Sequence, residues 1–423
     1  MKEDNKDILN EFPKRLGLNK IRILKLLKKL GNPHKCLPPV IHIAGTNGKG
    51  STTAFIKAGL ESRGDKVHVF TSPHLIDITE RILIAGEQID KKYFNFLLKK
   101  CVDANGKDEL SLFELITTVA FLAFSKNKAQ WTILEVGLGG RLDSTNVIKN
   151  PYLSIITPIS LDHQEFLGDS IKKIALEKGG IIKKNSKVII SKQHNSALKV
   201  LKKIADNFNC KTSIYGNDFE SKHCKNSFLF YVKRKKLILP LPFLIGTHQI
   251  ENATVSMAAL IKLKCRKKNL VAALKNVSWP GRLQKIDKGK LIPKDLEING
   301  QIFIDGGHNI SAGIALSKWI KNLRQGKFFV IIGMMNNKNI EGFLKPLKPY
   351  IYKLLAIKIP QQKNAYHSQD IVEKSKALGI NSQVTESLEK ALEIISEDQS
   401  FLPKRVLITG SLYLVGYFLE KNK

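Results

Sequence analysis

The chain has 423 residues, of which 43% are hydrophobic, and is therefore long enough for two or three domains with separate cores. Its apolar runs are strand-length, well short of the roughly 20 residues that span a bilayer, and Met1 opens into charged residues rather than a signal peptide. The five cysteines are scattered without a Cys-x-x-Cys pair, which argues against a disulfide framework or a zinc site. We expect a cytoplasmic protein with reduced thiols.

The net charge of +32 raises the question of a nucleic-acid partner. Of the 69 basic residues 10 are Arg, which leaves 59 Lys, whereas Arg is preferred for bidentate contacts to phosphates and bases. The lysines are also spread over the whole chain. We therefore favour a lysine-rich solvated surface, which could still speed the capture of an anionic substrate.

The first part of the chain alternates predicted helices and strands. Residues 19–30 have the apolar spacing of a helix and stop at Gly31-Asn32-Pro33. Beyond them, strands are predicted at 39–45, 66–72, 131–136, 153–159 and 187–191, and helices at 49–63, 91–103 and 112–126. Apolar strands separated by helices indicate a mostly parallel sheet covered on both faces.

The pattern changes at residues 214–245, which are typical of short antiparallel strands and predict a flap. A helix at about 250–263 follows, and a second alternation begins after Trp279-Pro280-Gly281. Its predicted strands are 301–305, 327–333, 353–357 and 405–410, and its helices are 311–323, 340–348, 367–377, 386–397 and one at the end of the chain. We predict two α/β domains, residues 1–278 with a mostly parallel sheet and the flap, and a smaller Rossmann-like domain at residues 279–423.

The segment Gly45-Thr46-Asn47-Gly48-Lys49-Gly50-Ser51 follows a predicted strand and opens a predicted helix. A plain left-handed turn would explain one glycine, whereas three glycines with a lysine at a helix start favour binding of phosphate groups. The spelling departs from the usual phosphate loop because Gly50 separates Lys49 from Ser51. The N–H groups from Asn47 to Ser51 should converge on one point that faces Glu135.

Two further segments end predicted strands with polar residues. Glu135 begins the glycine-rich stretch 135–146, where a carboxylate at a strand end could meet a metal held by phosphates, with Arg141 and Asp143 as polar anchors. Asp162-His163 follows another apolar strand, although a single histidine is more often structural than a ligand. Composition alone cannot single out Lys178 among the many lysines.

Several stretches taken together resemble a known family: IHIAGTNGKGS, TSPHL, EVGLGGRLDSTN, LDHQEFLGDSI, EKGGIIK, GTHQIENA, WPGRLQ, IDGGHN and GSLYLVG. In this order they resemble folylpolyglutamate synthase, and more closely its bacterial bifunctional form that is also dihydrofolate synthase, of the Mur ligase superfamily. The resemblance runs from about residue 30 to 416. It implies a Mur-ligase-type ATP-binding domain, a C-terminal glutamate ligase domain, and a phosphate loop spelled as it is here.

The resemblance also implies an activity and a site. ATP would phosphorylate a carboxylate of dihydropteroate or of a folate, and the amine of L-glutamate would displace the phosphate; the cofactors are ATP and two Mg²⁺ ions. Catalytic roles fall to Lys49, His163 and Lys178, with Lys178 carboxylated by CO2 to N6-carboxylysine. Ser72 and Glu135 would hold the first magnesium, and His163 the second.

The remaining implied residues form two sets. ATP-binding residues are Gly45, Thr46, Asn47, Gly48, Lys49, Gly50, Ser51, Asn252, Arg282, Asp305 and His308. Substrate-binding residues are Ser72, Pro73, His74, Ser111, Leu112, Phe113, Glu114, Leu142, Asp143 and Ser144.

Three alternatives remain beside the bifunctional ligase. A synthase limited to polyglutamation is the nearest. A cell-wall amino-acid ligase of the same superfamily is less well supported, because the first 30 residues offer no separate domain for a UDP-sugar. A lysine-rich nucleic-acid-dependent ATPase is the most remote. We expect a monomer with small-molecule substrates and without a nucleic-acid or membrane partner.

Overall fold

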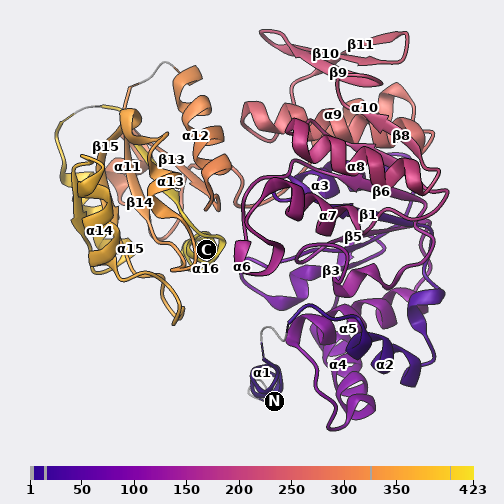
Figure 1. Cartoon of the computed structure of the whole chain (residues 1–423). Coiled ribbons are helices and arrows are strands. Elements are labelled where there is room, and N and C mark those ends of the chain that lie inside the picture. The colour runs from indigo at the N-terminus through magenta and orange to yellow at the C-terminus, as the bar shows by residue number, and fades with distance from the viewer. Residues whose placement is uncertain (1–3, 14–16, 324–325, 401) are drawn as a thin grey trace. The chain divides into compact units, whose positions relative to one another are not determined.

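The computed structural model describes residues 4–13, 17–323, 326–400 and 402–423 of the chain, shown in Figure 1. The described chain forms two units. The first comprises Met1–His74, Ile78–Phe243 and Ile250–Val277, and the second comprises Leu75–Asp77, Leu244–Gln249 and Ser278–Lys423. Each unit is built around a mostly parallel sheet with helices, which confirms the predicted α/β class.

An eight-stranded sheet forms the centre of the first unit. Its strands are, in spatial order, β4 (Glu87–Gln88), β3 (Ile82–Ile84), β2 (Val67–Phe70), β5 (Trp131–Glu135), β1 (Val40–Ala44), β6 (Leu153–Ile156), β7 (Lys187–Ile190) and β8 (Lys211–Ile214). Only the pairs β2–β3 and β3–β4 are antiparallel. The central strands are apolar and buried on both faces, as expected for a parallel sheet between layers of helices.

Helices lie on both sides of this sheet (Figure 1). α2, α4 and α5 share one apolar cluster, α7 and α8 share a second, and α3 packs against α10. The helices of this unit are α1 (Asp4–Glu11), α2 (Ile21–Lys29), α3 (Lys49–Glu61), α4 (Lys91–Asn105), α5 (Leu112–Lys126), α6 (Gln164–Leu167), α7 (Ile171–Gly179), α8 (Asn195–Asn207), α9 (Thr247–Lys262) and α10 (Lys267–Asn276).

The predicted flap is a separate antiparallel sheet of three strands, in the order β11 (Lys235–Pro240), β10 (Ser227–Val232) and β9 (Phe219–His223). Phe228 and Phe230 alternate with less buried residues along β10, so one face of the flap is apolar and buried. The hydroxyl of Thr254 in α9 donates to that of Ser221 in β9, at 2.7 Å, and ties the flap to the first unit.

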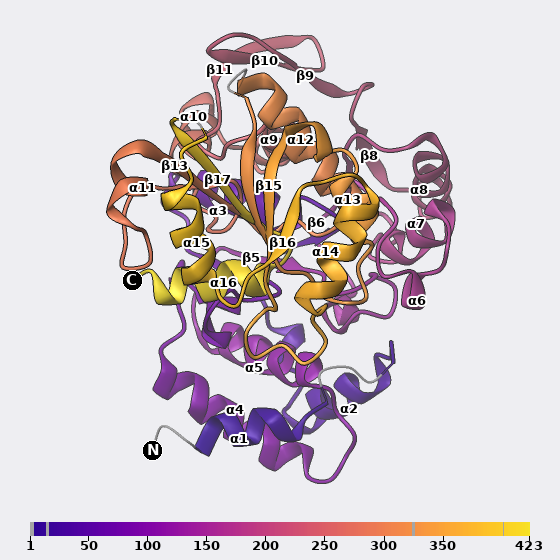
Figure 2. The same ribbon diagram turned by 90° about the vertical axis from the view of Figure 1, so that its left-hand side faces the viewer.

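The second unit has a six-stranded sheet in the order β12 (Gln284–Ile286), β13 (Gly300–Asp305), β17 (Lys404–Thr409), β14 (Phe328–Ile332), β15 (Ile351–Ala356) and β16 (Ser382–Val384). Only β12 runs antiparallel to its neighbour. One apolar cluster joins the sheet to α12 (Ile310–Leu323), α13 (Ile340–Leu344) and α14 (Ser368–Ala377), and a second joins it to α11 (Lys294–Asn299), α15 (Leu388–Glu397) and α16 (Leu412–Lys421). Figure 2 shows these two sets of helices around the sheet.

Some elements differ from those predicted. The helix predicted over 340–348 ends at Leu344, because Pro346 cannot donate the next helical hydrogen bond, and only a short 3-10 turn, Lys348–Tyr350, follows. The elements that were not predicted are the helices α1, α6, α7, α8, α10 and α11 and the short strands β3, β4, β8, β12 and β16.

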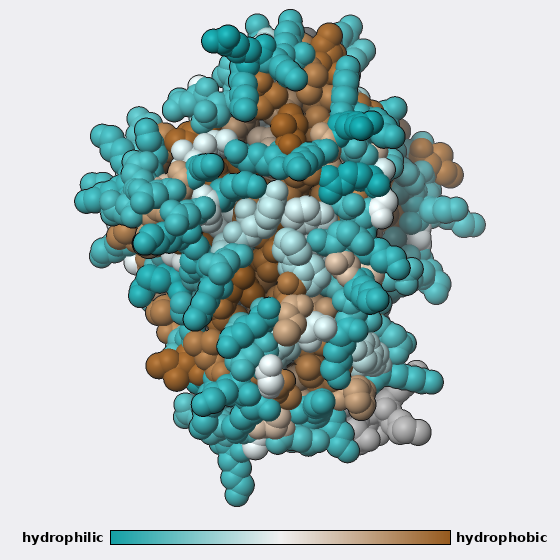
Figure 3. Space-filling model, turned by 90° about the vertical axis from the view of Figure 1, so that its right-hand side faces the viewer, coloured by the Kyte–Doolittle hydropathy of each residue, from teal (hydrophilic) through white to brown (hydrophobic). Residues whose placement is uncertain are grey.

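The hydropathy of the surface and the lengths of the helices can be compared with those of a membrane-spanning protein. Hydrophilic side chains cover most of the face drawn in Figure 3, with smaller hydrophobic areas between them. Among the described residues, no helix has the length and hydropathy needed to cross a bilayer.

Candidate active site

The loop that joins β1 to α3 is shaped by its glycines. A Cβ atom built on Gly45 would lie 1.8 Å from Thr157 Oγ1, so only glycine fits this approach to β6 and the residues after it. Gly48 is left-handed, with φ of +82°, and a Cβ there would meet Asn252 Oδ1 at 2.3 Å. The predicted ATP-binding residue Asn252 therefore lies against the loop within the first unit.

Not every N–H group of this loop is directed as expected. The N–H groups of Thr46 and Asn47 donate to the carbonyl of Pro158, at 2.9 and 3.3 Å. The Asn47 N–H thus binds protein in this structure instead of joining a set that faces Glu135. The start of α3, from Lys49 onward, is where the positive end of a helix dipole lies, the usual place for an anion.

Three neighbouring strands bring Lys49, Glu135 and Ser72 together. Because β1 and β2 flank β5 in parallel, the residues at their carboxyl ends meet at one sheet edge. Lys49 Nζ donates to the carbonyls of Gly45 and Thr46, at 3.2 and 3.3 Å, and lies 4.0 Å from Glu135 Oε1. The Ser72 N–H approaches Glu135 Oε2 at 3.5 Å.

Lys178 reaches the same loop from the last turn of α7. Its side chain is buried, and Nζ donates to the Gly45 carbonyl at 2.9 Å, so Lys178 and Lys49 donate to the same oxygen. Burial and the charge of Lys49 lower the pKa of Lys178 to about 7, against smaller opposite effects of Asp162 and Asp143. No local sequence pattern predicts the lowered pKa of Lys178, because the loop that Lys178 contacts is far away in sequence: Lys178 and Gly45 are 133 positions apart.

His163 follows β6 on the other side of β1 and stands just before α6, in the left-handed region with φ of 51°. Its backbone N–H donates to Asp162 Oδ1 at 2.9 Å, and its Nε2 lies 3.9 Å from the same oxygen. Asp162 therefore lies beside this histidine at the carboxyl edge of the sheet.

The donor set suits a magnesium ion held partly by phosphate. Glu135 offers a buried carboxylate beside Ser72, and oxygen ligands are those that Mg²⁺ prefers. Nowhere in the described ranges do three His, Cys, Asp or Glu side chains gather into a site of their own. The residues present therefore fit an ion that takes its remaining ligands from nucleotide phosphates and water.

In the glycine-rich turn after β5, the carboxylate of Asp143 accepts hydrogen bonds from other residues of the same turn. Asp143 Oδ2 accepts from the Leu138 N–H at 2.9 Å, and Oδ1 accepts from the N–H and hydroxyl of Thr145. Ser144 is buried in the 3-10 turn Ser144–Val147, and Leu142 is half-buried. Burial raises the pKa of Asp143 in spite of these hydrogen bonds.

The predicted substrate-binding residues 111–114 also stabilise the start of α5. Ser111 caps α5: its hydroxyl oxygen accepts from the Glu114 N–H at 3.3 Å, and its own N–H donates to Glu114 Oε2 at 2.7 Å, which together form a capping box. Glu114 is also paired with Arg22, at 3.1 Å. Arg22 was missed, since nothing in the sequence links it to a glutamate 92 residues away. Leu112 and Phe113 occupy the first turn of this helix.

The segment Ser72-Pro73-His74 follows β2 at the same sheet edge. His74 Nδ1 accepts a hydrogen bond from Arg81 Nε at 2.9 Å, which fixes the side from which this ring can donate. Arg81 was not predicted as a site residue either.

The predicted ATP-binding residues of the second unit come together at the end of β13. Asp305 accepts from the N–H groups of Leu283 and Gly307, at 2.9 and 2.8 Å. Arg282 Nη1 donates to the Gly281 carbonyl at 3.4 Å, and His308 Nδ1 lies 3.0 Å from the Gly306 carbonyl. Two loops of this unit thus present an arginine and a histidine around a carboxylate that is held by backbone donors.

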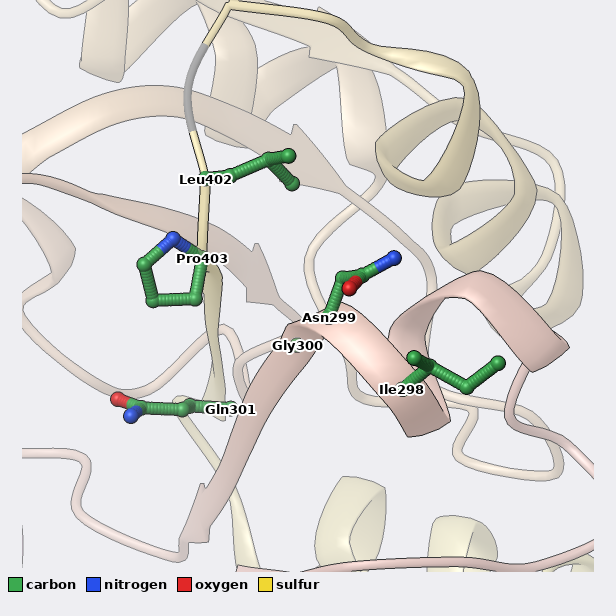
Figure 4. A pocket seen from close by; sticks show the side chains of 6 residues that line it. All are labelled: Ile298, Asn299, Gly300, Gln301, Leu402 and Pro403. Atoms are coloured by element: carbon green, nitrogen blue, oxygen red, sulfur yellow. The ribbon is translucent and has the colours of Figure 1, made fainter.

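A pocket in the second unit lies apart from these residues, where α11 meets β13 (Figure 4). It is lined by Ile298, Asn299, Gly300, Gln301, Leu402 and Pro403. Because it offers no ionisable group and no predicted residue, we assign no chemistry to it.

The fit of Gly45 leads to a prediction. Gly45→Ala should reduce ATP turnover about 100-fold, because the methyl group must displace the loop from Thr157 and a shift near 1 Å has that effect on a positioned reaction. Steady-state assays of ADP release measure it. Gly17→Ala is the matched control, since a Cβ there meets nothing within 4 Å, and unchanged turnover in Gly45→Ala would refute the proposed fit.

Comparison with known proteins agrees with this geometry. The family described as Mur ligase middle domain matches residues 43–260, and the family described as dihydrofolate synthetase, C-terminal domain, matches residues 291–421. Dihydrofolate synthetase of Saccharomyces cerevisiae is 32% identical over 96% of this chain and 97% of its own length. Dihydrofolate synthase/folylpolyglutamate synthase of Bacillus subtilis is 31% identical over 95% and 94%.

A solved structure shows the same fold. Escherichia coli FolC, in complex with DHPP and ADP, superimposes with a TM-score of 0.87 at 26% identity and covers 98% of this chain and 95% of that one. The sequence and structural similarities extend over both units. The chain therefore belongs to the dihydrofolate synthase/folylpolyglutamate synthase family of the Mur ligases and is an ATP-dependent ligase that forms carbon–nitrogen bonds.

Proposed function

We propose that this ligase joins L-glutamate to dihydropteroate and to folates, and that the residues around the Gly45 carbonyl carry out the activation step. The observation that carries the proposal is the meeting of Lys49 and Lys178 at that carbonyl, beside Glu135. The two amines meet at one carbonyl beside the Glu135 carboxylate, and the Lys49 ammonium among them is suited to binding nucleotide phosphates.

The chemistry requires activation because a carboxylate has no good leaving group. A carboxylate oxygen of the pterin substrate attacks the γ-phosphorus of ATP, ADP departs, and an acyl phosphate forms. The amine of glutamate then attacks the acyl carbon, phosphate leaves with the C–O bond electrons, and the amine loses a proton as the amide forms. Lys49 would stabilise the charge on the transferring phosphoryl group, as in other phosphoryl transfers.

The metal would be held by Ser72 and Glu135, with His163 at a second position. When bound, magnesium supplies positive charge that neutralises phosphate oxygens. The Asp162 carboxylate lies 3.9 Å from Nε2 of His163.

Lys178 is suited to carboxylation by CO2. The ammonium first loses one proton; the neutral amine then attacks the carbon of CO2, a C–N bond forms as the π electrons of one C=O bond move to oxygen, and the nitrogen releases a second proton, which leaves an anionic carbamate. Lowering the pKa from its ordinary value near 10.5 to about 7 raises the neutral fraction at pH 7 from roughly 1 in 3,000 to about one half. The carbamate would also remove the repulsion between Lys178 and Lys49.

A pH dependence follows from this. At fixed dissolved CO2, carbamate formation should rise as the pH increases through about 7, because the reactive amine is the form that exists above its pKa. Carbon-13 NMR of protein in labelled bicarbonate, titrated from pH 6 to 11, measures it. A carbamate signal that begins to rise only near pH 10 would contradict the lowered pKa.

The pterin substrate would lie near the residues that follow β2, begin α5 and form the turn after β5. In the structure Ser111, Glu114 and Asp143 are engaged in local hydrogen bonds, and His74 accepts one from Arg81. We expect the apolar side chains of Phe113 and Leu142 to make direct contacts to the ligand, with the His74 ring beside them. ATP would also contact Asn252, Arg282, Asp305 and His308.

The more specific part of the proposal is that the protein catalyses both ligations, on dihydropteroate and on folates. The yeast relative is named for dihydrofolate synthesis alone and the Bacillus relative for both reactions. A product assay with ATP, magnesium and glutamate, in which dihydropteroate and tetrahydrofolate are offered separately, tests it. We expect dihydrofolate from the first and a glutamate-extended folate from the second; product from only one substrate would restrict the function to that ligation.

We further propose that the protein works as a cytoplasmic monomer on small molecules, without a nucleic-acid or membrane partner. All five cysteines are free thiols, which suits a reducing compartment. ATPase activity that responds to RNA but not to dihydropteroate would favour the nucleic-acid-dependent alternative.

A further inference from the structure

His42 lies at the centre of the first sheet, three residues before the phosphate loop, and is completely buried. Its Nε2 lies 2.8 Å from the hydroxyl oxygen of Thr145, and that hydroxyl donates to Asp143 Oδ1 at 2.6 Å. A hydroxyl whose own proton is given to Asp143 must accept from His42. The histidine therefore carries its proton on Nε2 and donates it to Thr145.

This chain continues from Asp143 to the backbone of Lys178. Asp143 also accepts from the Leu138 N–H and thereby fixes the glycine-rich turn after β5. That turn lies directly on the end of α7: the Arg141 N–H donates to the Glu177 carbonyl at 2.7 Å, and a Cβ on Gly140 would lie 3.0 Å from Lys178 Cα.

The contacts close into a ring. The Lys178 amine donates to the Gly45 carbonyl at 2.9 Å, and Gly45 directly follows β1, the strand that carries His42. Both the backbone and the amine of Lys178 are thus fixed relative to the same strand, one through the turn and one through the loop.

We propose that His42 is a positioning residue for Lys178, acting through Thr145 and Asp143 to hold the lysine amine where it is carboxylated. The inference rests on the proposed carboxylation of Lys178 and adds to it the group that orders its surroundings. His42 does not touch the reacting atoms. Removing its N–H donor takes one of the two hydrogen bonds from the Thr145 hydroxyl and loosens the turn on which the Lys178 backbone rests.

His42 stays in the required protonation state at neutral pH. Burial, together with the charge of Lys183, lowers the pKa of His42 to about 3, so the ring is neutral and donates from one nitrogen only. Lys183 is the charged group that faces it from the segment after α7, and Asp143 is reached through Thr145.

A second buried histidine, His68, serves as a control that distinguishes positioning of Lys178 from a general contribution to stability. His68, on β2, is equally buried, contacts the Asn127 carbonyl at 3.0 Å and stacks on Phe124, with ring centroids 4.7 Å apart. None of the contacts described for it leads to the turn or to Lys178. His42→Leu and His68→Leu should both reduce the melting temperature, so stability alone does not distinguish the two residues.

The test measures the carbamate directly in the full-length protein. Wild type, His42→Leu, His42→Gln and His68→Leu are titrated with carbon-13 bicarbonate at pH 7.5, and the NMR signal of the lysine carbamate is followed. We expect His42→Leu to raise the bicarbonate concentration for half occupancy about tenfold, the lower end of effects seen for residues that orient a reactive group. His42→Gln, whose amide can donate to Thr145, should recover most of the occupancy, and His68→Leu should match the wild type.

Each possible result of this titration supports or overturns the positioning role of His42. Wild-type occupancy in folded His42→Leu overturns the inference while leaving the role of Lys178 intact, and an equal loss in His68→Leu shows a general effect of destabilisation and overturns it too. No carbamate in the wild type overturns the carboxylation and, with it, this inference. Where Leu at position 42 prevents folding, Thr145→Val, which removes the same link at nearly constant volume, is measured in its place with the same expected loss.

Discussion

Lys49→Ala should reduce ATP turnover by roughly 100- to 1,000-fold, the usual effect of removing one stabilising donor from a preorganised site. The Lys49 ammonium lies between the Gly45 and Thr46 carbonyls and Glu135. Without it, the Glu135 carboxylate would face the phosphates with less compensating charge. ADP release in the presence of dihydropteroate and glutamate measures the loss.

Lys57→Ala is the matched control for this change. Lys57 lies two turns further along α3, and its partner is Glu61, four residues on, at 2.8 Å on the surface. It should release ADP at the wild-type rate. Near-normal ADP release by Lys49→Ala would show that the loop does not hold the phosphates.

Lys178→Ala should abolish amide formation and should be rescued in part by formate or acetate. The reason is chemical: the proposed carbamate supplies an anionic carboxylate-like group, and a small carboxylate can occupy the space that the side chain leaves. Initial rates of product formation at increasing formate concentrations, with chloride at equal ionic strength for comparison, measure the rescue. Undiminished activity of Lys178→Ala would contradict a catalytic role.

Lys183→Ala controls for the loss of a lysine with a lowered pKa. Burial and the charge of Lys20 lower the pKa of Lys183 to about 8, and its amine donates to the Gly180 carbonyl at 3.0 Å. We expect its activity to be independent of formate. Equal stimulation of both variants by formate would mean that the rescue is not specific to position 178.

The fold was predictable where local signals and packing agree. The helix predicted over 112–126 is observed with these bounds, because Ser111 and Glu114 form a capping box at its start and its apolar residues face the core. The central strands were predictable from continuous apolar runs. By contrast, α8 begins with a histidine cap, a weak signal, and the strands β3 and β4 have only three and two residues.

The site was less predictable from the residues alone. The phosphate loop and Glu135 could be proposed from their positions at strand ends, since parallel strands bring such residues to one edge. The pairing of Arg22 with Glu114, the approach of Lys178 to Gly45 and the chain from His42 to Asp143 join residues far apart in sequence. They depend on the strand order, in which β1 lies between β5 and β6, and no local pattern encodes that order.

The most direct test of the proposed chemistry follows an oxygen atom. Dihydropteroate labelled with oxygen-18 in its carboxylate is converted with ATP, magnesium and glutamate, and the released phosphate is analysed by mass spectrometry. If the carboxylate oxygen attacks the γ-phosphorus, each phosphate carries one labelled oxygen and the new amide keeps the other. Unlabelled phosphate released together with amide product would contradict an acyl-phosphate intermediate.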